Sequence, residues 1–357
     1  MKVVPGVEQP PVVSTAHLER IRKARRRRLS APEYVDGILN GDRAILAQAI
    51  TLVESSRPDD AELSQEIIEA CLPHTGDSVR VGITGIPGVG KSTFIEALGT
   101  HLTQERGERV AVLAIDPSSQ KSKGSILGDK TRMEKLAADE RAFIRPSPSG
   151  GSLGGITRRT RESMLLCEAA GFKNVLVETV GVGQSETAVS AMVDFFLLLM
   201  LAGAGDELQG IKRGIMEMSD LIAINKADGN NLQKAKAAAT EYRSALHLFP
   251  PSETGWDPRV VICSALTRDG IAEIWNIILD HRRHVIDRGL FEQRRQEQAR
   301  QWMHEMIEQE LQSRFSNDPA VKSALAAYER KVTEGKISSF RAARVLLDLH
   351  ANGEDKD

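Results

Sequence analysis

Short apolar runs in the middle of the chain alternate with stretches of helical periodicity. The runs predict strands at Val79–Thr84, Arg109–Ile115, Ala142–Arg145, Asn174–Glu178, Phe195–Met200, Leu221–Ile224 and Val260–Cys263. The stretches between and after them predict helices at Ser92–Glu105, Thr157–Ala170, Ile211–Met218, Leu232–Leu246 and Ile271–His284. Several runs are apolar on both faces, as expected of parallel strands covered by helices. The pattern predicts an α/β fold with a doubly wound, mostly parallel sheet, whose ligands bind at the carboxyl ends of the strands.

The pattern on the amino-terminal side of this segment is helical. Ser30 and Glu33 have the spacing of a capping box, and a further helix is predicted over Ala61–Leu72. The basic stretch Arg25–Arg28 precedes them. A solvated basic helix face explains this stretch better than a patch for nucleic acid or another anionic partner.

The carboxyl-terminal side is also helical, with segments predicted at Phe291–Phe315, Asp318–Thr333 and Ser338–His350. An amphipathic extension beside a complete α/β unit needs a surface to cover, so a dimerisation or partner-docking arm is favoured over packing on the same chain. The expected division is a flexible basic arm at 1–29, a helical region at 30–76, an α/β domain at 77–284 and a helical dimerisation region at 285–357.

Composition excludes several other classes of protein. The chain has 357 residues, of which 41% are hydrophobic and 27% charged, and a net charge of −2, which argues against a nucleic-acid or membrane-surface role. Its cysteines, Cys71, Cys167 and Cys263, form no C-x-x-C pair and are expected to be buried free thiols. The longest apolar run, Phe195–Ala202, is too short to span a bilayer, and no signal-peptide core is visible. A cytoplasmic protein is expected.

The strongest chemical signal follows the first predicted strand and opens the next helix. It has the pattern G-x-x-x-x-G-K-S of a phosphate-binding P-loop, formed by Gly85, Ile86, Pro87, Gly88, Val89, Gly90, Lys91, Ser92 and Thr93. The glycines let successive backbone N–H groups point at phosphate oxygens. Lys91 is expected to reach the β- and γ-phosphates, and Ser92 to give its hydroxyl to Mg²⁺. A glycine-rich turn without a ligand is disfavoured, because strand, loop and helix are all in register.

A second motif selects the base. The strand ending at Ile224 is followed by Asn225, Lys226, Ala227 and Asp228, the pattern N-K-x-D. One carboxylate, that of Asp228, can accept from both the ring N–H and the exocyclic amine of guanine, whereas adenine has no such pair. After the next strand, Ser264, Ala265 and Leu266 can bring a backbone N–H to the guanine carbonyl. A helix-capping role for Asp228 is the weaker alternative, so the motifs together predict GTP rather than ATP.

Three further loops follow predicted strands. Glu178 and Gly181 stand where most GTPases carry Asp-x-x-Gly, so Glu178 is expected to contact Mg²⁺ through water and the Gly181 N–H to sense the γ-phosphate. The next residue, Val182, cannot orient the attacking water as the Gln of Ras-type proteins does, so intrinsic hydrolysis should be slow unless Gln184 or Glu186 supplies this function.

The loop that begins at Asp116 is either a surface turn or a switch whose carboxylates meet Mg²⁺ or the lytic water. The loop from Ala202 to Lys212 carries glycines that permit movement and charges without an evident structural role.

These loops together resemble the MeaB/ArgK/MMAA GTPases of the SIMIBI class. The resemblance rests on GITGIPGVGKST, AIDPSS, GSILGDKTRM, ETVGVGQSE, AGAGDELQGIKRGI, INKAD and CSAL, spread over roughly Asp36 to Trp275. It implies a G-protein chaperone of an adenosylcobalamin-dependent acyl-CoA mutase, chiefly methylmalonyl-CoA mutase, that gates cofactor loading, protects or reactivates the mutase and is stimulated by it. It also implies that Asp116, Asp129 and Glu178 belong to the Mg²⁺ and switch constellation. The segment Gln120–Lys123 departs from many relatives.

The expected protein is a homodimeric, Mg²⁺-dependent GTPase that binds GTP and GDP, with Lys91, Asp116 and Glu178 serving hydrolysis and Ser92, Asp116, Asp129 and Glu178 holding the metal. Adenosylcobalamin is expected only in the partner mutase, since the chain lacks an Asp-x-His-x-x-Gly loop. Two alternatives remain. A nickel metallochaperone GTPase would need a His-rich tract or Cys/His site, and the eight His are scattered. A transport-linked kinase would need ATP and an acceptor site.

Overall fold

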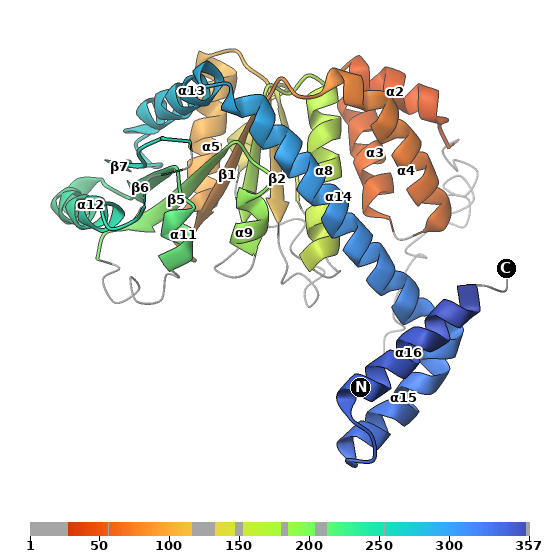
Figure 1. Ribbon diagram of the computed structural model, residues 1–357. Helices are drawn as coiled ribbons and strands as arrows, with labels where there is room; N and C mark the ends of the chain where they lie inside the picture. Colours follow the sequence, from red (N-terminus) through yellow and green to blue (C-terminus); the bar gives the residue numbers. More distant parts are fainter. Residues whose placement is uncertain are drawn as a thin grey trace, which may run out of the picture.

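The fold is a parallel sheet flanked by helices (Figure 1). The computed structural model describes residues 28–55, 57–115, 133–146, 153–179, 185–203, 213–250, 252 and 254–354. Within them the sheet has the strand order β3-β2-β4-β1-β5-β6-β7, and every paired neighbour is parallel. The strands are β1 (Val79–Gly85), β2 (Val110–Ile115), β3 (Ala142–Arg145), β4 (Asn174–Thr179), β5 (Phe195–Leu201), β6 (Leu221–Asn225) and β7 (Arg259–Ile262). The predicted strands are confirmed, each end within one residue.

Helices lie on both faces of the sheet, as the doubly wound prediction requires (Figure 1). The elements between the strands are α5 (Lys91–Thr100), η2 (His101–Glu105), α7 (Glu134–Ala137), α8 (Leu153–Ala169), α9 (Ser185–Ser190), α11 (Arg213–Glu217), η4 (Gly229–Asn231) and α12 (Leu232–Leu246). After β7 the chain forms α13 (Ile271–Asp287). Two differences from the prediction stand out. Helix α8 begins four residues earlier, at Leu153, and so includes Gly154 and Gly155, and the short α9 has too few residues for a periodicity to be visible.

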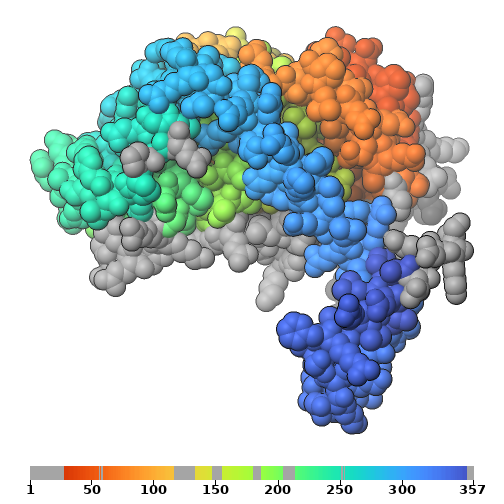
Figure 2. All heavy atoms as spheres, in the orientation of Figure 1, coloured from red at the N-terminus to blue at the C-terminus, as the bar shows by residue number. Residues whose placement is uncertain are grey.

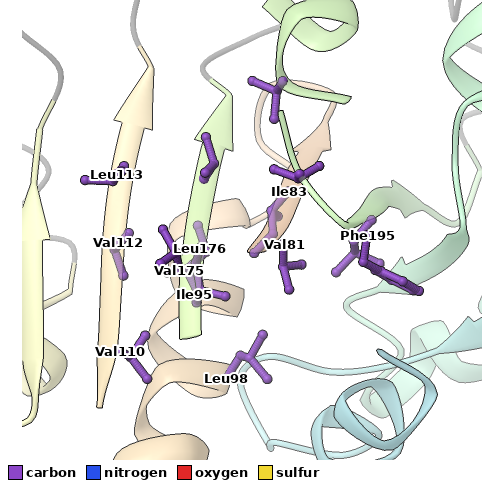
Figure 3. Packing of buried hydrophobic residues seen from close by; sticks show 14 of the residues in the cluster. Val81, Ile83, Ile95, Leu98, Val110, Val112, Leu113, Val175, Leu176 and Phe195 are labelled. Atoms are coloured by element: carbon purple, nitrogen blue, oxygen red, sulfur yellow. The ribbon is translucent and has the colours of Figure 1, made fainter. Parts of the chain in front are cut away.

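The core is one continuous apolar cluster between the sheet and its helices. Valines, isoleucines and leucines of β1, β2 and β4 pack against Ile95 and Leu98 of α5 (Figure 3). The amino-terminal helices α2 (Ala31–Leu39), α3 (Arg43–Glu54) and α4 (Pro58–Cys71) contribute to the same cluster and contact α8, which the short η1 (Leu72–His74) also contacts. The three cysteines are free and buried, as expected.

The predicted capping pattern at the start of α2 is present. The Glu33 carboxylate accepts from both the backbone N–H and the hydroxyl of Ser30, each at 2.9 Å. Just before it, Arg28 pairs with Asp60 of α4 at 2.7 Å, so the last of the four arginines links the segment before α2 to α4. Arg25, Arg26 and Arg27 lie outside the described residues.

The carboxyl-terminal helices are α14 (Leu290–Asn317), α15 (Pro319–Thr333) and α16 (Ser339–Glu354). Helix α14 starts at the amino ends of β1 and β5, where Arg295 pairs with Asp194 at 2.6 Å and donates to the carbonyl of Gly76. It then crosses α8, where Arg161 pairs with Glu305 at 2.5 Å. It therefore runs antiparallel to α8 and carries α15 and α16 past the edge of the sheet where the strands end (Figures 1 and 2).

The base of α14 rests on a buried charge cluster. Arg80 of β1 pairs with Glu168 of α8 at 2.6 Å, and Arg295 lies 3.9 Å from the same carboxylate. Burial raises the pKa of Glu168, but the hydrogen bond and charge of Arg80 outweigh it, so the pKa lies below its usual range. No helix in the described part of the chain is long and apolar enough to cross a membrane.

Candidate nucleotide-binding site

The predicted P-loop leaves β1 at the centre of the sheet and enters α5 directly. At Gly85 the backbone φ is +152°, and a Cβ there would lie 2.4 Å from the carbonyl oxygen of Leu199. Gly90 has a left-handed φ of +94° and precedes the first residue of α5. Both positions therefore require glycine, for steric room at the first and for backbone conformation at the second. Pro87 and Gly88 are exposed at the tip, while Ile86 and Val89 are buried beneath it.

Lys91 and Ser92 open α5 and meet the end of β4. The Lys91 ammonium donates to the carbonyls of Gly85 at 2.7 Å and Ile86 at 3.3 Å. Burial lowers the pKa of Lys91, and the carboxylates of Glu178 and Glu186 oppose this shift. The lysine charge therefore lies in the field of two carboxylates that come from β4 and α9.

The Ser92 hydroxyl donates a hydrogen bond to Glu178 Oε1 at 3.2 Å, and Glu178 is 4% exposed. A hydroxyl and a carboxylate side by side beneath a phosphate loop are the hard oxygen donors that Mg²⁺ prefers, so the two predicted metal residues fit the ion. The other two, Asp116 and Asp129, lie outside the described residues, as do Gly181, Val182 and Gln184. Within the described ranges no group of three or more His, Cys, Asp or Glu side chains could hold a metal.

The base-recognition residues lie next to the P-loop because β6 is separated from β1 only by β5. Asn225 donates to the carbonyl of Val89 at 2.9 Å, and Lys226 donates to that of Gly88 at 2.8 Å. These two bonds tie the N-K-x-D segment to the P-loop. Figure 1 shows β6 beside β5 in the sheet.

The segment after β7 completes this region. The Ser264 hydroxyl donates to Asp228 Oδ2 at 2.5 Å, and the Ala265 N–H donates to Asn225 Oδ1 at 3.1 Å. Ala265 was one of the residues whose N–H could reach the guanine carbonyl, and here its N–H links the two base-recognition segments instead. Leu266 is 79% exposed. Thr93 is exposed at the start of α5.

One residue of this region has no motif to mark it. Asn231, at the end of η4, donates its side-chain amide to the carbonyl of Lys226 at 2.7 Å. Sequence reasoning passed over it because an Asn before a helix is ordinarily a cap. The only sequence signal is that it lies three residues after Asp228.

Comparisons with known proteins show the family of the chain. Residues 46–320 match the family model described as methylmalonyl Co-A mutase-associated GTPase MeaB. A probable GTPase of Mycobacterium tuberculosis is 50% identical over 328 residues, covering 91% of this chain and 97% of that protein. The mitochondrial methylmalonic aciduria type A homolog of Mus musculus is 46% identical over 321 residues, covering 87% of this chain and 77% of its own length.

Among solved structures, the crystal structure of a LAO/AO transport system kinase is similar with a TM-score of 0.72 and 42% identity, covering 89% of this chain and 96% of that one. The family model spans more than half of the chain, and it includes the P-loop and the N-K-x-D segment. The chain therefore belongs to the family of MeaB methylmalonyl-CoA mutase-associated GTPases, and it is a GTPase with a P-loop fold.

Proposed function

We propose that this GTPase is a chaperone of a cobalamin-dependent acyl-CoA mutase, namely methylmalonyl-CoA mutase or a close relative. In this role it gates adenosylcobalamin loading and protects or reactivates the mutase. The observation that carries the proposal is the match of residues 46–320 to a family described by its association with that mutase. The cobalamin belongs to the partner, and the chain itself binds GTP and GDP.

The reaction is attack of water on the γ-phosphate of GTP, which yields GDP and phosphate. The Lys91 ammonium is the group of this chain placed to neutralise charge on the phosphate oxygens. Ser92 and Glu178, together with Asp116 and Asp129, would hold Mg²⁺, which when bound supplies further positive charge at the phosphates. Gly181 would sense the γ-phosphate. Asn225, Lys226 and Asp228, with the segment Ser264–Leu266, hold the guanine.

Hydrolysis should be slow without the partner, because the aliphatic side chain of Val182 cannot orient water. Glu186 is buried in α9 close enough to Lys91 to affect its pKa, which keeps it a candidate for this function. Gln184 is the other. The mutase would then speed turnover by completing the water-positioning geometry, as partners do for other slow GTPases.

We also propose that residues 285–357 form a homodimer contact. Along α14, Met303, Ile307 and Leu311 recur every four residues and are 52%, 49% and 59% exposed. On α16, Phe340 is 87% and Leu347 56% exposed. Because the arm extends past the sheet edge that carries the nucleotide loops, a second copy held there would lie beside them. Sedimentation at micromolar concentration should give a dimer, and Phe340→Ser with Leu347→Ser should give a monomer.

The direct test of the chaperone role is GTP turnover with and without purified methylmalonyl-CoA mutase. The proposal expects slow release of phosphate by the GTPase alone and a marked rise when the mutase is added. A pull-down from cells grown with cobalamin should then recover mutase subunits. Fast turnover without a partner would contradict the inference from Val182, and an unchanged rate with every cobalamin-dependent acyl-CoA mutase supplied would contradict the chaperone role.

The kinase alternative rests on the name of the similar crystal structure. A kinase would transfer the γ-phosphate to an acceptor, whereas the GTPase releases it as inorganic phosphate. GTP and, in a parallel reaction, ATP, each radiolabelled at the γ-phosphate and incubated with candidate basic amino acids, separate the two reactions. We expect all label in inorganic phosphate. The nickel-chaperone alternative stays an untested prediction, which a nickel titration of the full chain would address.

A further inference from the structure

We infer that Asn231 is a positioning residue for guanine recognition, because its side chain holds the N-K-x-D segment in the conformation that presents Asp228. This inference rests on the proposed assignment of Asp228 as the guanine acceptor. It adds a residue that no part of the N-K-x-D motif includes and that bonds to the backbone of the segment, not to the Asp228 carboxylate.

The backbone of the segment is strained at Lys226. Its φ is +58°, and among the described residues only Lys226 and Arg268 adopt a positive φ without being glycine. Lys226 belongs to the N-K-x-D segment, and Arg268 lies two residues after the segment Ser264–Leu266. For a residue with a Cβ this left-handed conformation is unfavourable, and it persists only where surrounding contacts impose it.

Asn231 supplies those contacts to the backbone of the segment. Its Nδ2 donates to the carbonyl oxygen of Lys226 at 2.7 Å, and its backbone N–H donates to the carbonyl oxygen of Asp228 at 3.0 Å. The first bond closes a loop over residues 227–230, and the second closes the turn from Asp228 to Asn231. Since a carbonyl can only accept, the amide nitrogen must face Lys226, which fixes the orientation of the Asn231 side chain.

The ordinary role of an asparagine at this place is to cap the following helix. Asn231 does stand at the N-cap position of α12, yet its side chain accepts no hydrogen bond from the first turn. The side chain is a donor directed back at Lys226, whereas a cap would be an acceptor directed at the helix N–H groups. Its geometry therefore serves the base-recognition segment and not α12.

The other residues of the N-K-x-D segment are held by further hydrogen bonds. Asn225 is tied to Val89 and Ala265, and the Ala227 N–H donates to the carbonyl of Cys263 at 3.0 Å. The Asp228 carboxylate is held by Ser264. Without the Asn231 amide, the Lys226 carbonyl loses its partner and the left-handed turn loses the bond that opposes its relaxation. The Asp228 carboxylate would then shift relative to the plane of the base.

The test measures dissociation constants for GDP and for IDP, whose hypoxanthine lacks the exocyclic amine of guanine. Asn231→Ala and Asn231→Asp both remove the donor, and the second preserves the shape of the side chain. We expect GDP binding to weaken about tenfold in each, the loss of one hydrogen bond that holds a binding group. IDP binding should weaken less, because it uses one of the two donors that Asp228 accepts, so the preference for guanine should fall.

The neighbouring Asn230, which is exposed, gives the matched control, and Asn230→Ala should leave both constants unchanged. Asn231→Ala should also matter less in a Lys226→Gly background, since glycine adopts a positive φ without support. Equal weakening of GDP and IDP, wild-type affinity in Asn231→Asp, or additive effects in the Lys226→Gly cycle would each overturn the inference. The variant Asp228→Asn separates failure of the base assignment from failure of the role of Asn231. If Asp228→Asn leaves GDP binding unchanged, the base assignment itself fails. If Asp228→Asn abolishes the preference for guanine while Asn231→Ala does not alter it, only the role of Asn231 fails.

Discussion

The two ends of the nucleotide site are built on different principles. At the base end the recognition groups bond to fixed parts of the protein: Asn225 to Val89 and Ala265, and Ser264 to Asp228. At the phosphate end the groups meant for the nucleotide bond to their own surroundings: Lys91 to the P-loop carbonyls and Ser92 to Glu178. At the base end these bonds hold the Asp228 carboxylate in place. At the phosphate end, Lys91 and Ser92 would have to give up their present contacts in order to bind phosphate and Mg²⁺.

This difference separates selection of the base from coupling between phosphate binding and movement of the protein. Under the proposed assignment, a base site whose groups are already ordered would select guanine at little conformational cost. Exchange of contacts around Lys91 and Glu178 instead links phosphate binding to rearrangement near β4 and α9, where a partner can influence it. Changes at the base end should therefore alter which nucleotide binds, and changes at the phosphate end should alter what happens to it.

The largest effect is expected from Lys91→Ala. Removal of the ammonium should lower the rate of GTP hydrolysis by about 10²–10³-fold, as loss of one charge-stabilising donor does in other enzymes. The preference for guanine over xanthine should persist, since the base end is untouched. Phosphate-release kinetics and competitive binding measure the two. Lys234→Ala, an exposed lysine of α12, is the control, and hydrolysis retained within a few-fold in Lys91→Ala would contradict the role of this residue.

Asp228→Asn tests the base end. An amide cannot accept from both guanine donors, so GDP affinity should fall about a hundredfold and xanthine diphosphate should bind better than before. Hydrolysis of a nucleotide that is bound at saturation should change little. Titration with both diphosphates measures the switch, and Asp287→Asn at the exposed end of α13 controls for loss of charge alone. Unchanged GDP affinity would refute the base assignment.

Glu178→Gln tests the phosphate end without removing the Ser92 contact, since the amide oxygen can still accept that hydrogen bond. Loss of the negative charge should lower the Mg²⁺ affinity or the hydrolysis rate by about 10–100-fold, the range seen for changes to groups around a metal. Guanine preference should stay the same. A magnesium titration of the hydrolysis rate is the measurement, and wild-type Mg²⁺ dependence would remove Glu178 from the metal site.

The smallest effect on nucleotide binding is expected from Asp220→Asn, at the opposite end of β6 from Asn225. Burial raises the pKa of Asp220 to about 6, and the charge of Arg294 and the hydrogen bond from the Phe196 N–H only partly oppose this. The folded state thus holds the proton to a higher pH than the unfolded chain, so this group's contribution to stability is present at low pH and lost as pH rises through about 6.

Asp220→Asn should remove this pH dependence, making the variant more stable relative to wild type at pH 7 than at pH 4, with a difference of about 2 kcal/mol. Urea denaturation at the two pH values measures it. The GDP-to-XDP preference should not change, which separates stability of the strand from base recognition. A wild-type pH profile in the variant would show that Asp220 does not carry the effect.

Much of the fold could be read from the sequence because each strand is an apolar run bounded by polar loops, as in Phe195–Leu201 and Leu221–Asn225. The P-loop and N-K-x-D segments were visible because their chemistry needs fixed residue types at fixed spacing. Asn231 was not visible, since its role depends on where its amide points. Contacts such as Arg80–Glu168 and Arg161–Glu305 join residues far apart in the chain and carry no local pattern.

The independence of the two ends can be measured directly as the ratio of the XDP to the GDP dissociation constant, with Mg²⁺ and with excess chelator. Chelation removes the metal from the phosphate end and should weaken both nucleotides together. If the base end is preformed by Asn225, Ser264 and Asp228, the ratio stays constant within about twofold while the individual constants change. A ratio that falls toward one in chelator would show that guanine recognition is assembled only when the phosphate end is engaged, and would contradict the account.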